Sequence, residues 1–350
     1  MLDSAPLRDY AFLLLPAANR VYAEEAGRLS IGELGVVNEQ LLGKRIGEVR
    51  EERIGGVRYI RFAAEALQER DVRVLSNLSS MYALFEIDGD ALRPIEVQPL
   101  DRFDDDLITI PKYQGKTNES FTKLLLNVTM AATAFAPEML DRRMTILDPL
   151  CGRGTTLNQA LMYGWNASGI DIDERDIEAY EQFISTYLKR KHIKHTLQSS
   201  AIREQKKQVG RRFDVELAPT KEEFKSGDTM RLIALSADTT LAPRFFKAGS
   251  FDAIATDLPY GVQHGSRTAR QELSRRPLEL LEAALPAWKA MLRRGGAIGF
   301  AWNRHVAGRE KVVELIAANG LQVMDSEPYL SFRHVVDQSI TRDLIVARLL

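Results

Sequence analysis

From residue 144 onward, short apolar strands alternate with longer amphipathic helices, and this alternation restricts the fold more than any other feature of the sequence. Strands are expected at Met144–Leu147, Ala167–Asp171, Arg231–Ser236, Phe251–Thr256 and Ala297–Trp302, and helices at Thr155–Tyr163, Glu174–Arg190, Leu278–Leu292 and Arg309–Asn319. The segments Leu321–Asp325 and Thr341–Leu349 close the chain. Strands joined by helices pair in parallel, and the helices cover both faces of the sheet. The pattern therefore predicts an α/β fold with a Rossmann-like, doubly wound, mostly parallel sheet.

The residues before this region predict a smaller unit. Strands are expected at Tyr10–Leu15, Gly56–Phe62, Val72–Val74 and Tyr82–Ile87, and helices at Ala23–Leu29 and Ile46–Glu51. A chain of 350 residues is long enough for two domains. We expect a small N-terminal α+β domain over residues 1–110 and the α/β domain over residues 111–350, joined by the acidic stretch 101–106. A helix capped by Asn118 and running from Ser120 to Thr133 opens the second domain.

Composition limits the environment and the partners of the chain. The formal net charge is −1, which excludes a generally cationic nucleic-acid binder and leaves room only for local basic patches. The single cysteine, Cys151, cannot form an internal disulfide, which favours a reducing, cytoplasmic location. No apolar run approaches the roughly 20 residues that span a bilayer. We expect no membrane partner and no required metal.

A glycine loop follows the first strand of the α/β region. It reads Asp148-Pro-Leu-Cys151-Gly152-Arg-Gly154-Thr155 and opens the next helix. Glycines let the backbone approach a ligand closely, and a helix N-terminus offers free N–H groups that suit a carboxylate. A Gly-x-Gly pair can equally be a plain turn from strand to helix. We expect Asp148, Cys151, Gly152, Gly154 and Thr155 to lie at a cofactor site.

Acidic residues after the following strands extend this candidate site. Asp171 lies about twenty residues past the glycines, the spacing at which a carboxylate reaches ribose hydroxyls. Its neighbour Ile172 is included in the site, whereas Asp173 is expected to cap the next helix. Asp238 is expected either to accept the adenine amino group of the cofactor or to be an ordinary loop aspartate.

A second motif, Asp257-Leu-Pro-Tyr260-Gly, ends the strand Phe251–Thr256. A carboxylate that accepts one N–H of a planar amine, with a backbone carbonyl taking the other, favours the pyramidal, reactive amine. Asp257 supplies the carboxylate and Leu258 the carbonyl, and Pro259 confines Leu258 to extended geometry. Tyr260 offers a face on which a base can stack. The alternative for the motif is a plain turn, because proline and glycine are turn formers.

Together the two motifs predict binding of S-adenosylmethionine (SAM) and methylation of an exocyclic amino group on a nucleobase. They resemble those of the class I SAM-dependent RNA methyltransferases grouped with the THUMP-associated tRNA guanine-N2 methyltransferases, over about residues 111–350. The resemblance implies that the glycine loop, Asp171 and Asp257 lie at the SAM site, that the Asp257 turn holds the target amine, and that the helix after Asn118 packs beside the cofactor. The family commonly has proline where this chain has Leu258, and restoring proline is expected to be tolerated or beneficial.

The same resemblance extends to the N-terminal region. Its first ~110 residues resemble the leading ferredoxin-like portion of the tRNA enzymes, which implies an accessory role in RNA binding. A basic segment from Lys189 to Arg212, within an insertion spanning 189–230, suits phosphate contacts, although such charge runs are commonly solvated helical faces. The RNA-binding set expected from it is Lys206, Lys207, Arg211 and Arg212. After the catalytic turn, His264, Arg267 and Arg270 could guide a substrate or simply occupy a loop.

We expect methylation of guanine N2 in tRNA, with ribosomal RNA as another possible substrate. A DNA adenine-N6 or cytosine-N4 methyltransferase shares the chemistry, but such enzymes usually carry a large target-reading region, for which little sequence remains here. A SAM-binding, RNA-binding module without catalysis is a further alternative. Leu258 favours that module, whereas Asp257 and Tyr260 favour an enzyme. A dinucleotide oxidoreductase would have no need of the Asp-x-Pro-Tyr turn.

Overall fold

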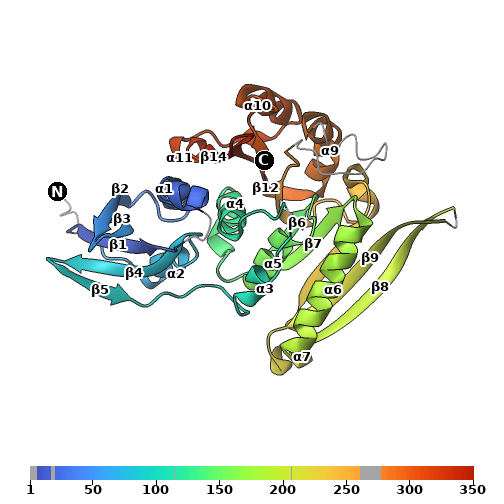
Figure 1. Cartoon of the computed structure of the whole chain (residues 1–350), viewed down its shortest axis with the longest axis horizontal. Coiled ribbons are helices and arrows are strands. Elements are labelled where there is room, and N and C mark those ends of the chain that lie inside the picture. The colour runs from blue at the N-terminus through green and yellow to red at the C-terminus, as the bar shows by residue number, and fades with distance from the viewer. Residues whose placement is uncertain (1–5, 17–19, 114, 206, 261–276) are drawn as a thin grey trace.

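The chain is described by a computed structural model that covers residues 6–16, 20–113, 115–205, 207–260 and 277–350. Two β-sheets lie side by side, and helix α4 (Glu119–Ala131) lies between them (Figure 1). Within the described ranges, no helix is both long and apolar enough to cross a bilayer.

The N-terminal sheet is antiparallel and has the strand order β2-β3-β1-β4-β5. Its elements are β1 (Arg8–Leu14), α1 (Arg20–Gln40), β2 (Ile46–Ile54), β3 (Val57–Ala64), α2 (Glu69–Leu75), β4 (Met81–Asp88) and β5 (Ala91–Ile95). The first six follow the β-α-β-β-α-β order of a ferredoxin-like fold, with β1 and β3 in the middle of the sheet, and β5 extends one edge.

Two expected elements of this region have the opposite secondary structure. The strand expected at Val72–Val74 lies in helix α2, because the Asp71 carboxylate accepts the N–H of Gln68 at 3.0 Å and fixes the helix start. The helix expected at Ile46–Glu51 belongs to strand β2. A β-bulge between Gly47 and Arg50 inserts a residue there, so apolar side chains recur at a spacing that imitates a helical turn.

The larger sheet occupies the rest of the chain, after the short helix α3 (Asp106–Thr109), α4 and the 3₁₀ turn η1 (Ala136–Glu138). Its strands are β6 (Thr145–Asp148), β7 (Asn166–Asp171), β8 (Lys194–Glu204), β9 (Lys207–Ala218), β10 (Met230–Ser236), β11 (Phe251–Asp257), β12 (Leu292–Asn303), β13 (Gln322–Val323), β14 (His334–Asp337) and β15 (Ile340–Arg348). Its helices are α5 (Thr155–Met162), α6 (Glu174–Arg190), α7 (Lys221–Ser226), η2 (Thr239–Arg244), α9 (Pro277–Met291), α10 (Arg309–Ala318) and α11 (Glu327–Leu330).

The strand order of the larger sheet is β13-β15-β12-β11-β6-β7-β10-β9-β8, with β14 paired to β15. Strands β12, β11, β6, β7 and β10 are parallel, as predicted, and antiparallel strands flank them on both sides. From β6 the chain proceeds to β7 and β10 on one side and then returns to β11 on the other. This reversal is a topological switch point, where open α/β sheets bind ligands beyond the carboxyl ends of their strands.

Side chains that alternate along the parallel strands enter two different cores. Ile146 packs into the core beneath α4, α5 and α6, whereas its neighbour Leu147 packs with Ile254 into the core beneath α9 and α10. Helix α4 approaches the sheet closely, because a Cβ on Gly299 of β12 would lie 1.9 Å from the Thr129 hydroxyl oxygen. Helices therefore cover both faces, and α4 holds the segment before it against the carboxyl edge of the sheet.

The two sheets share one continuous apolar core, which contains Phe12 of β1 and Leu124 of α4. Glu33 of α1 is fully buried at this junction and accepts hydrogen bonds from the Ser79 backbone N–H at 3.0 Å and from Asn127 Nδ2 of α4 at 2.7 Å. Burial raises the pKa of Glu33, while these hydrogen bonds act in the opposite direction. The N-terminal sheet is thus anchored to the larger sheet by packing and by a buried polar network.

Candidate active site

The glycine loop connects β6 to α5 at the carboxyl edge, beside the switch point. The Cys151 N–H donates to Ile170 O at 2.9 Å, which joins the loop to β7. Gly152 and Gly154 have positive φ values of 49° and 81°. A Cβ on Gly154 would lie 2.5 Å from the Tyr180 ring, whereas one on Gly152 would meet no atom of the described residues within 4 Å. Packing therefore requires glycine at 154, and the space in front of residue 152 is open.

Asp171 ends β7 and faces this loop. Its Oδ2 accepts the Gly152 N–H at 2.8 Å, and its Oδ1 accepts the Asp173 N–H at 2.9 Å. Burial raises the pKa of Asp171 to about 6, against the lowering effect of the two N–H groups. Each oxygen has a second lone pair, so the carboxylate can still accept two hydroxyl groups. Asp173 caps α6 through the Arg175 N–H at 2.9 Å, which confirms the role expected for it.

Other residues predicted at the cofactor site have partners inside the protein. The buried Asp148 accepts the Thr256 hydroxyl at 2.7 Å, and burial raises the pKa of Asp148 to about 6. Asp238 caps η2 by accepting the Thr240 N–H at 2.9 Å, which is the ordinary loop role left open by the sequence. Ile172 is 40% exposed next to Asp171 and leaves apolar surface at the mouth of the loop.

Asp257 ends β11, next to the glycine loop, because β11 pairs with β6. Its Oδ2 accepts the Thr117 hydroxyl at 2.8 Å, and its Oδ1 accepts the Tyr260 hydroxyl. Burial raises the pKa of Tyr260 well above its ordinary value, and the negative charge of Asp257 adds to this effect. Both carboxylate oxygens already hold hydroxyl groups, so an incoming amine must share or replace one of them.

Leu258 has a backbone role that the sequence did not show. Its N–H donates to Ala301 O of β12 at 2.9 Å, and its side chain is 3% exposed within the core beneath α9. Proline has no N–H and cannot make this bond. The structure therefore argues against the expectation that proline at 258 is tolerated. The adjacent Pro259 is half-buried and carries the chain on to Tyr260.

The segment before α4 bridges the two motifs, which sequence reasoning largely missed. The hydroxyls of Tyr113 and Thr155 lie 3.1 Å apart, and the Arg153 guanidinium lies 4.9 Å from the centre of the Tyr113 ring. Thr117, four residues later, reaches the catalytic turn as described above. The sequence signals were the Asn118 cap, whose Oδ1 accepts the Phe121 N–H at 3.1 Å, and the resemblance that placed this helix beside the cofactor.

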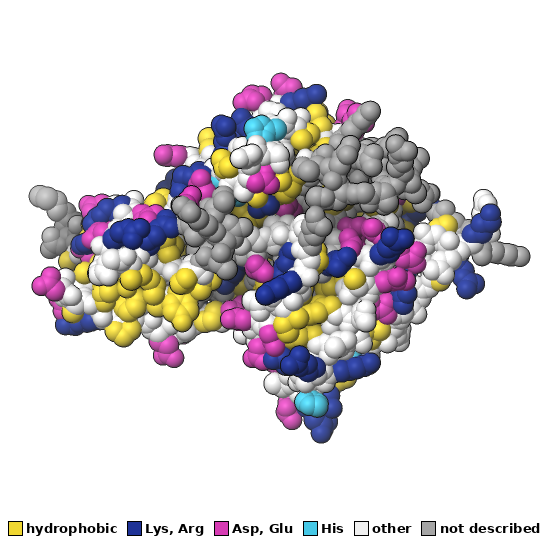
Figure 2. Space-filling model, viewed as in Figure 1, with side chains coloured by type: hydrophobic (Ala, Val, Ile, Leu, Met, Phe, Trp, Pro, Cys, Tyr) yellow, Lys and Arg dark blue, Asp and Glu magenta, His cyan; other side chains and the backbone are white. Residues whose placement is uncertain are grey.

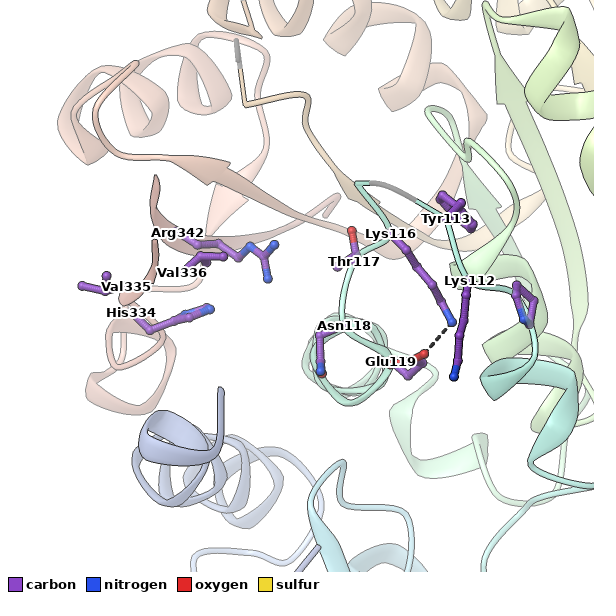
Figure 3. Close-up of a pocket in the computed structure, with 11 residues that line it drawn as sticks. Lys112, Tyr113, Lys116, Thr117, Asn118, Glu119, His334, Val335, Val336 and Arg342 are labelled. Carbon is purple, nitrogen blue, oxygen red and sulfur yellow. Dashed lines mark hydrogen bonds and ion pairs between the residues drawn. The ribbon is translucent and has the colours of Figure 1, made fainter. Parts of the chain in front are cut away.

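A cavity of about 550 Å³ opens next to the catalytic turn. Residues 111–113 and 116–119 form one wall, and β14 together with Arg342 of β15 forms the other (Figure 3). Binding sites for small molecules commonly have volumes of about 300–1,000 Å³, and the volume of this cavity lies within that range. Burial lowers the pKa of His334 in the second wall to about 4, which keeps its imidazole neutral. Arg342 therefore carries the positive charge of that wall.

The basic segment after α6 folds as the hairpin β8–β9, which lengthens the sheet next to β10. Arg212 pairs in register with Leu235 near the end of β10, so the tip of the hairpin extends beyond the same carboxyl edge that carries the two motifs. Lys207 is exposed at this tip. Lys206, together with His264, Arg267 and Arg270, lies outside the described residues.

The other two predicted RNA contacts are neutralised by neighbouring carboxylates. Arg211 pairs with Glu178 at 3.1 Å and with Glu181 at 2.8 Å, both on α6. Arg212 pairs with Asp214 at 2.6 Å. Figure 2 shows acidic and basic side chains next to one another over α6 and the hairpin, with basic side chains also at the tip. Arg203 and Lys207 are exposed at the tip, and no ion pair of the described residues involves them.

Residues 123–296 match the family model described as the RMKL-like methyltransferase domain. These residues are a class I, SAM-dependent methyltransferase domain. No curated protein matches the chain significantly.

Several solved structures resemble the methyltransferase in fold. A TehB-like SAM-dependent methyltransferase from Corynebacterium glutamicum is 15% identical, with 61% of this chain and 84% of that chain covered and a TM-score of 0.34. A precorrin-6y C5,15-methyltransferase from Geobacter metallireducens is 12% identical, with 72% of this chain and 99% of that chain covered and a TM-score of 0.36. A geranyl diphosphate methyltransferase in complex with SAM is 15% identical, with 71% of this chain and 95% of that chain covered and a TM-score of 0.33. At these identities and TM-scores the likeness carries no argument about the activity or the acceptor of this chain.

The residues around the glycine loop fit SAM, the cofactor of this class. The Asp171 carboxylate has spare lone pairs for the ribose hydroxyls. The N-terminus of α5 offers N–H groups to the carboxylate of the methionine moiety, and the space in front of Gly152 is open. When bound, SAM supplies an electrophilic methyl group on a sulfonium.

Proposed function

We propose that this methyltransferase methylates an exocyclic amino group of an RNA base, with guanine N2 in tRNA as the favoured target and ribosomal RNA as the other RNA candidate. The observation that carries the proposal is the position of Asp257. Asp257 ends β11 beside β6, which leads into the glycine loop, and its carboxylate accepts hydrogen bonds from Thr117, which lines the cavity, and from Tyr260. A carboxylate that accepts hydrogen bonds at this position suits a substrate amine, because the amine can donate its N–H groups to it.

The residues of the catalytic turn have separable tasks in this proposal. The nitrogen lone pair of a base amine is delocalised, and a hydrogen bond from that amine to Asp257 favours the pyramidal nitrogen that can attack. As the nitrogen gains the methyl group it loses a proton, which Asp257 is placed to accept. Tyr260 contributes an aromatic face for the base. The glycine loop and the segment 111–119 fix the distance between donor and acceptor, which is where most of the rate enhancement of such a displacement arises.

RNA as the substrate class is supported by the hairpin tip. Arg203 and Lys207 are exposed there and project beyond the carboxyl edge, so a strand whose base enters the cavity could place phosphates against them. The ferredoxin-like sheet, anchored beside α4, gives a second surface. We expect the sheet and the tip to hold the RNA around its target nucleotide.

Methyl transfer to isolated nucleic acids tests the proposal. Purified protein would be incubated with isotopically labelled SAM and, separately, with tRNA and ribosomal RNA from a deletion strain and with genomic DNA. Nucleoside digestion and mass spectrometry then identify the product. We expect labelled N2-methylguanosine from tRNA. Label in N6-methyladenine or N4-methylcytosine of DNA, or no label in any RNA, would refute it.

The isosteric substitution Asp257→Asn tests the assigned chemistry within that assay. The amide keeps the shape of the carboxylate but loses one acceptor and cannot take up a proton, so kcat should fall by about 10²–10⁴-fold. SAM affinity, measured by calorimetry, should stay close to wild type, because Asp257 acts on the acceptor. Asp228→Asn is the matched control, since Asp228 is an exposed carboxylate that pairs with Arg143 and its replacement should change kcat little. Equal kcat values for Asp257→Asn and wild type would remove Asp257 from the mechanism.

A further inference from the structure

Arg342 of β15 is buried at the junction between the cavity and the catalytic turn, with 6% of its side chain exposed. Its guanidinium carbon lies 4.3 Å from the centre of the Phe121 ring and 5.1 Å from the centre of the Tyr260 ring. The guanidinium thus lies close to both an aromatic ring of α4 and the aromatic ring of the catalytic turn. Figure 3 shows the side chain extending from its strand towards Thr117 on the opposite wall.

The polar contacts of Arg342 converge on the same turn. Its Nε donates to the Tyr260 hydroxyl, and that hydroxyl donates to Asp257 Oδ1. Its Nη2 lies 3.6 Å from Asp257 Oδ2, the oxygen that also accepts the Thr117 hydroxyl. One guanidinium therefore contacts the phenol by a hydrogen bond and lies near its ring, and it contacts the carboxylate by charge.

We propose that Arg342 is a positioning residue that holds Tyr260 and Asp257 in the geometry that receives the acceptor. The proposal rests on the function proposed above. Phe121 lies against the guanidinium, and the guanidinium holds both the Tyr260 hydroxyl and the Asp257 carboxylate, so the ring and the carboxylate keep a fixed relation. Because guanidinium is planar and presents fixed donors, it can stack and donate at once, which a lysine ammonium cannot do.

Substitutions at 342 separate positioning from simple structural support. Small errors in the placement of reacting groups can cost about 100-fold in rate, so we expect kcat of Arg342→Ala to fall by that order while SAM affinity is unchanged. Arg342→Lys keeps the charge but loses the planar fork, and it should recover only part of the rate. Dilute guanidinium chloride should restore activity to Arg342→Ala, because the free ion can occupy the space between the two rings.

Arg309→Ala is the matched control. Arg309 pairs at 3.3 Å with Asp343, the residue that follows Arg342 on β15, and 14% of its side chain is exposed. Successive strand residues point to opposite faces, and Arg309 is not among the residues that line the cavity. Removal of the Arg309 side chain should lower thermal stability without a selective loss of kcat. Added guanidinium should not restore that stability. If Arg309→Ala and Arg342→Ala behave alike in both respects, Arg342 has only a structural role.

A second measurement keeps the inference independent of the acceptor. The chain has ten tyrosines, and 3-fluorotyrosine labelling gives each a ¹⁹F resonance, of which the Tyr260→Phe variant assigns one. We expect the Tyr260 resonance to shift in Arg342→Ala and to return towards its original position when guanidinium is added to that variant. An unmoved Tyr260 resonance would overturn the inference whether or not RNA is methylated. Absence of RNA methylation by wild type with a shifted resonance would instead reject only the proposed function.

Discussion

Replacing Leu258 by proline would give the chain the commoner form of its catalytic motif, and we expect this change to damage the protein. In the structure the Leu258 N–H donates to Ala301 O at 2.9 Å, across the β11–β12 pair that ends at Asp257. Proline removes the donor and leaves a carbonyl at the edge of a buried core without its partner. The ring carbon that replaces the amide hydrogen would also stand well inside van der Waals contact of that oxygen.

The cost can be worked out from these contacts. Leaving a buried polar group unsatisfied costs about 1–3 kcal/mol. The Leu258 side chain is 3% exposed, and the smaller proline ring removes part of its packing, at about 1 kcal/mol per lost methylene when the cavity is included. We therefore expect Leu258→Pro to lower the free energy of unfolding by about 2–4 kcal/mol. Separation of β11 from β12 would also displace Asp257, so kcat should fall.

Urea denaturation followed by circular dichroism measures the change in stability, and methyl transfer to RNA measures kcat. Leu258→Ala is the control, because it keeps the N–H and removes most of the side chain. If the backbone bond matters, Leu258→Pro loses more activity than Leu258→Ala, even where the two lose similar stability. A proline variant with wild-type stability and rate would refute the reasoning and would restore the expectation drawn from the family motif.

The remaining predictions concern the cofactor carboxylate and the hairpin. Asp171→Ala should weaken SAM binding by one to two orders of magnitude in calorimetry, since hydrogen bonds to a charged group contribute about 1.5–3 kcal/mol. Burial raises the pKa of Asp171 to about 6, and SAM favours the ionised form of this carboxyl. SAM affinity should therefore rise as pH rises through 6, and below pH 6 it should fall by up to about tenfold per pH unit. Asp171→Asn should abolish that dependence, and an unaltered pH profile would exclude this carboxylate. Neutralising Arg203 and Lys207 should weaken RNA binding across unrelated sequences and reduce the slope of log affinity against log salt concentration by about 0.7 per lost contact. Neutralising Arg211 and Arg212, which are paired with carboxylates, should change neither quantity. Parallel slopes for wild type and both variants would leave the hairpin without a role in RNA binding.

Local patterns in the sequence determined much of this fold. Alternating strands and helices predicted the parallel sheet, and they did so because hydrophobic periodicity depends only on neighbouring residues. The helix starts at Asn118 and Asp173 were predictable for the same reason, since a cap is a contact over two or three residues. The two motifs fell at the carboxyl edge because each directly follows a strand. Where local patterns were ambiguous, as at Ile46–Glu51, a bulge imitated a helical turn and the prediction was wrong.

Only the tertiary structure decided which distant side chains complete the site. Arg342 meets Tyr260 across 82 residues, and Thr117 meets Asp257 across 140, because the packing of α4 and the insertion of β15 beside β12 bring these positions together. No spacing in the sequence encodes such contacts. The same holds for the charges of the hairpin, since a run of basic residues does not reveal that Arg211 faces carboxylates on α6. The sequence thus determined the strands and the turns that carry the chemistry, and sheet order with helix packing determined their partners.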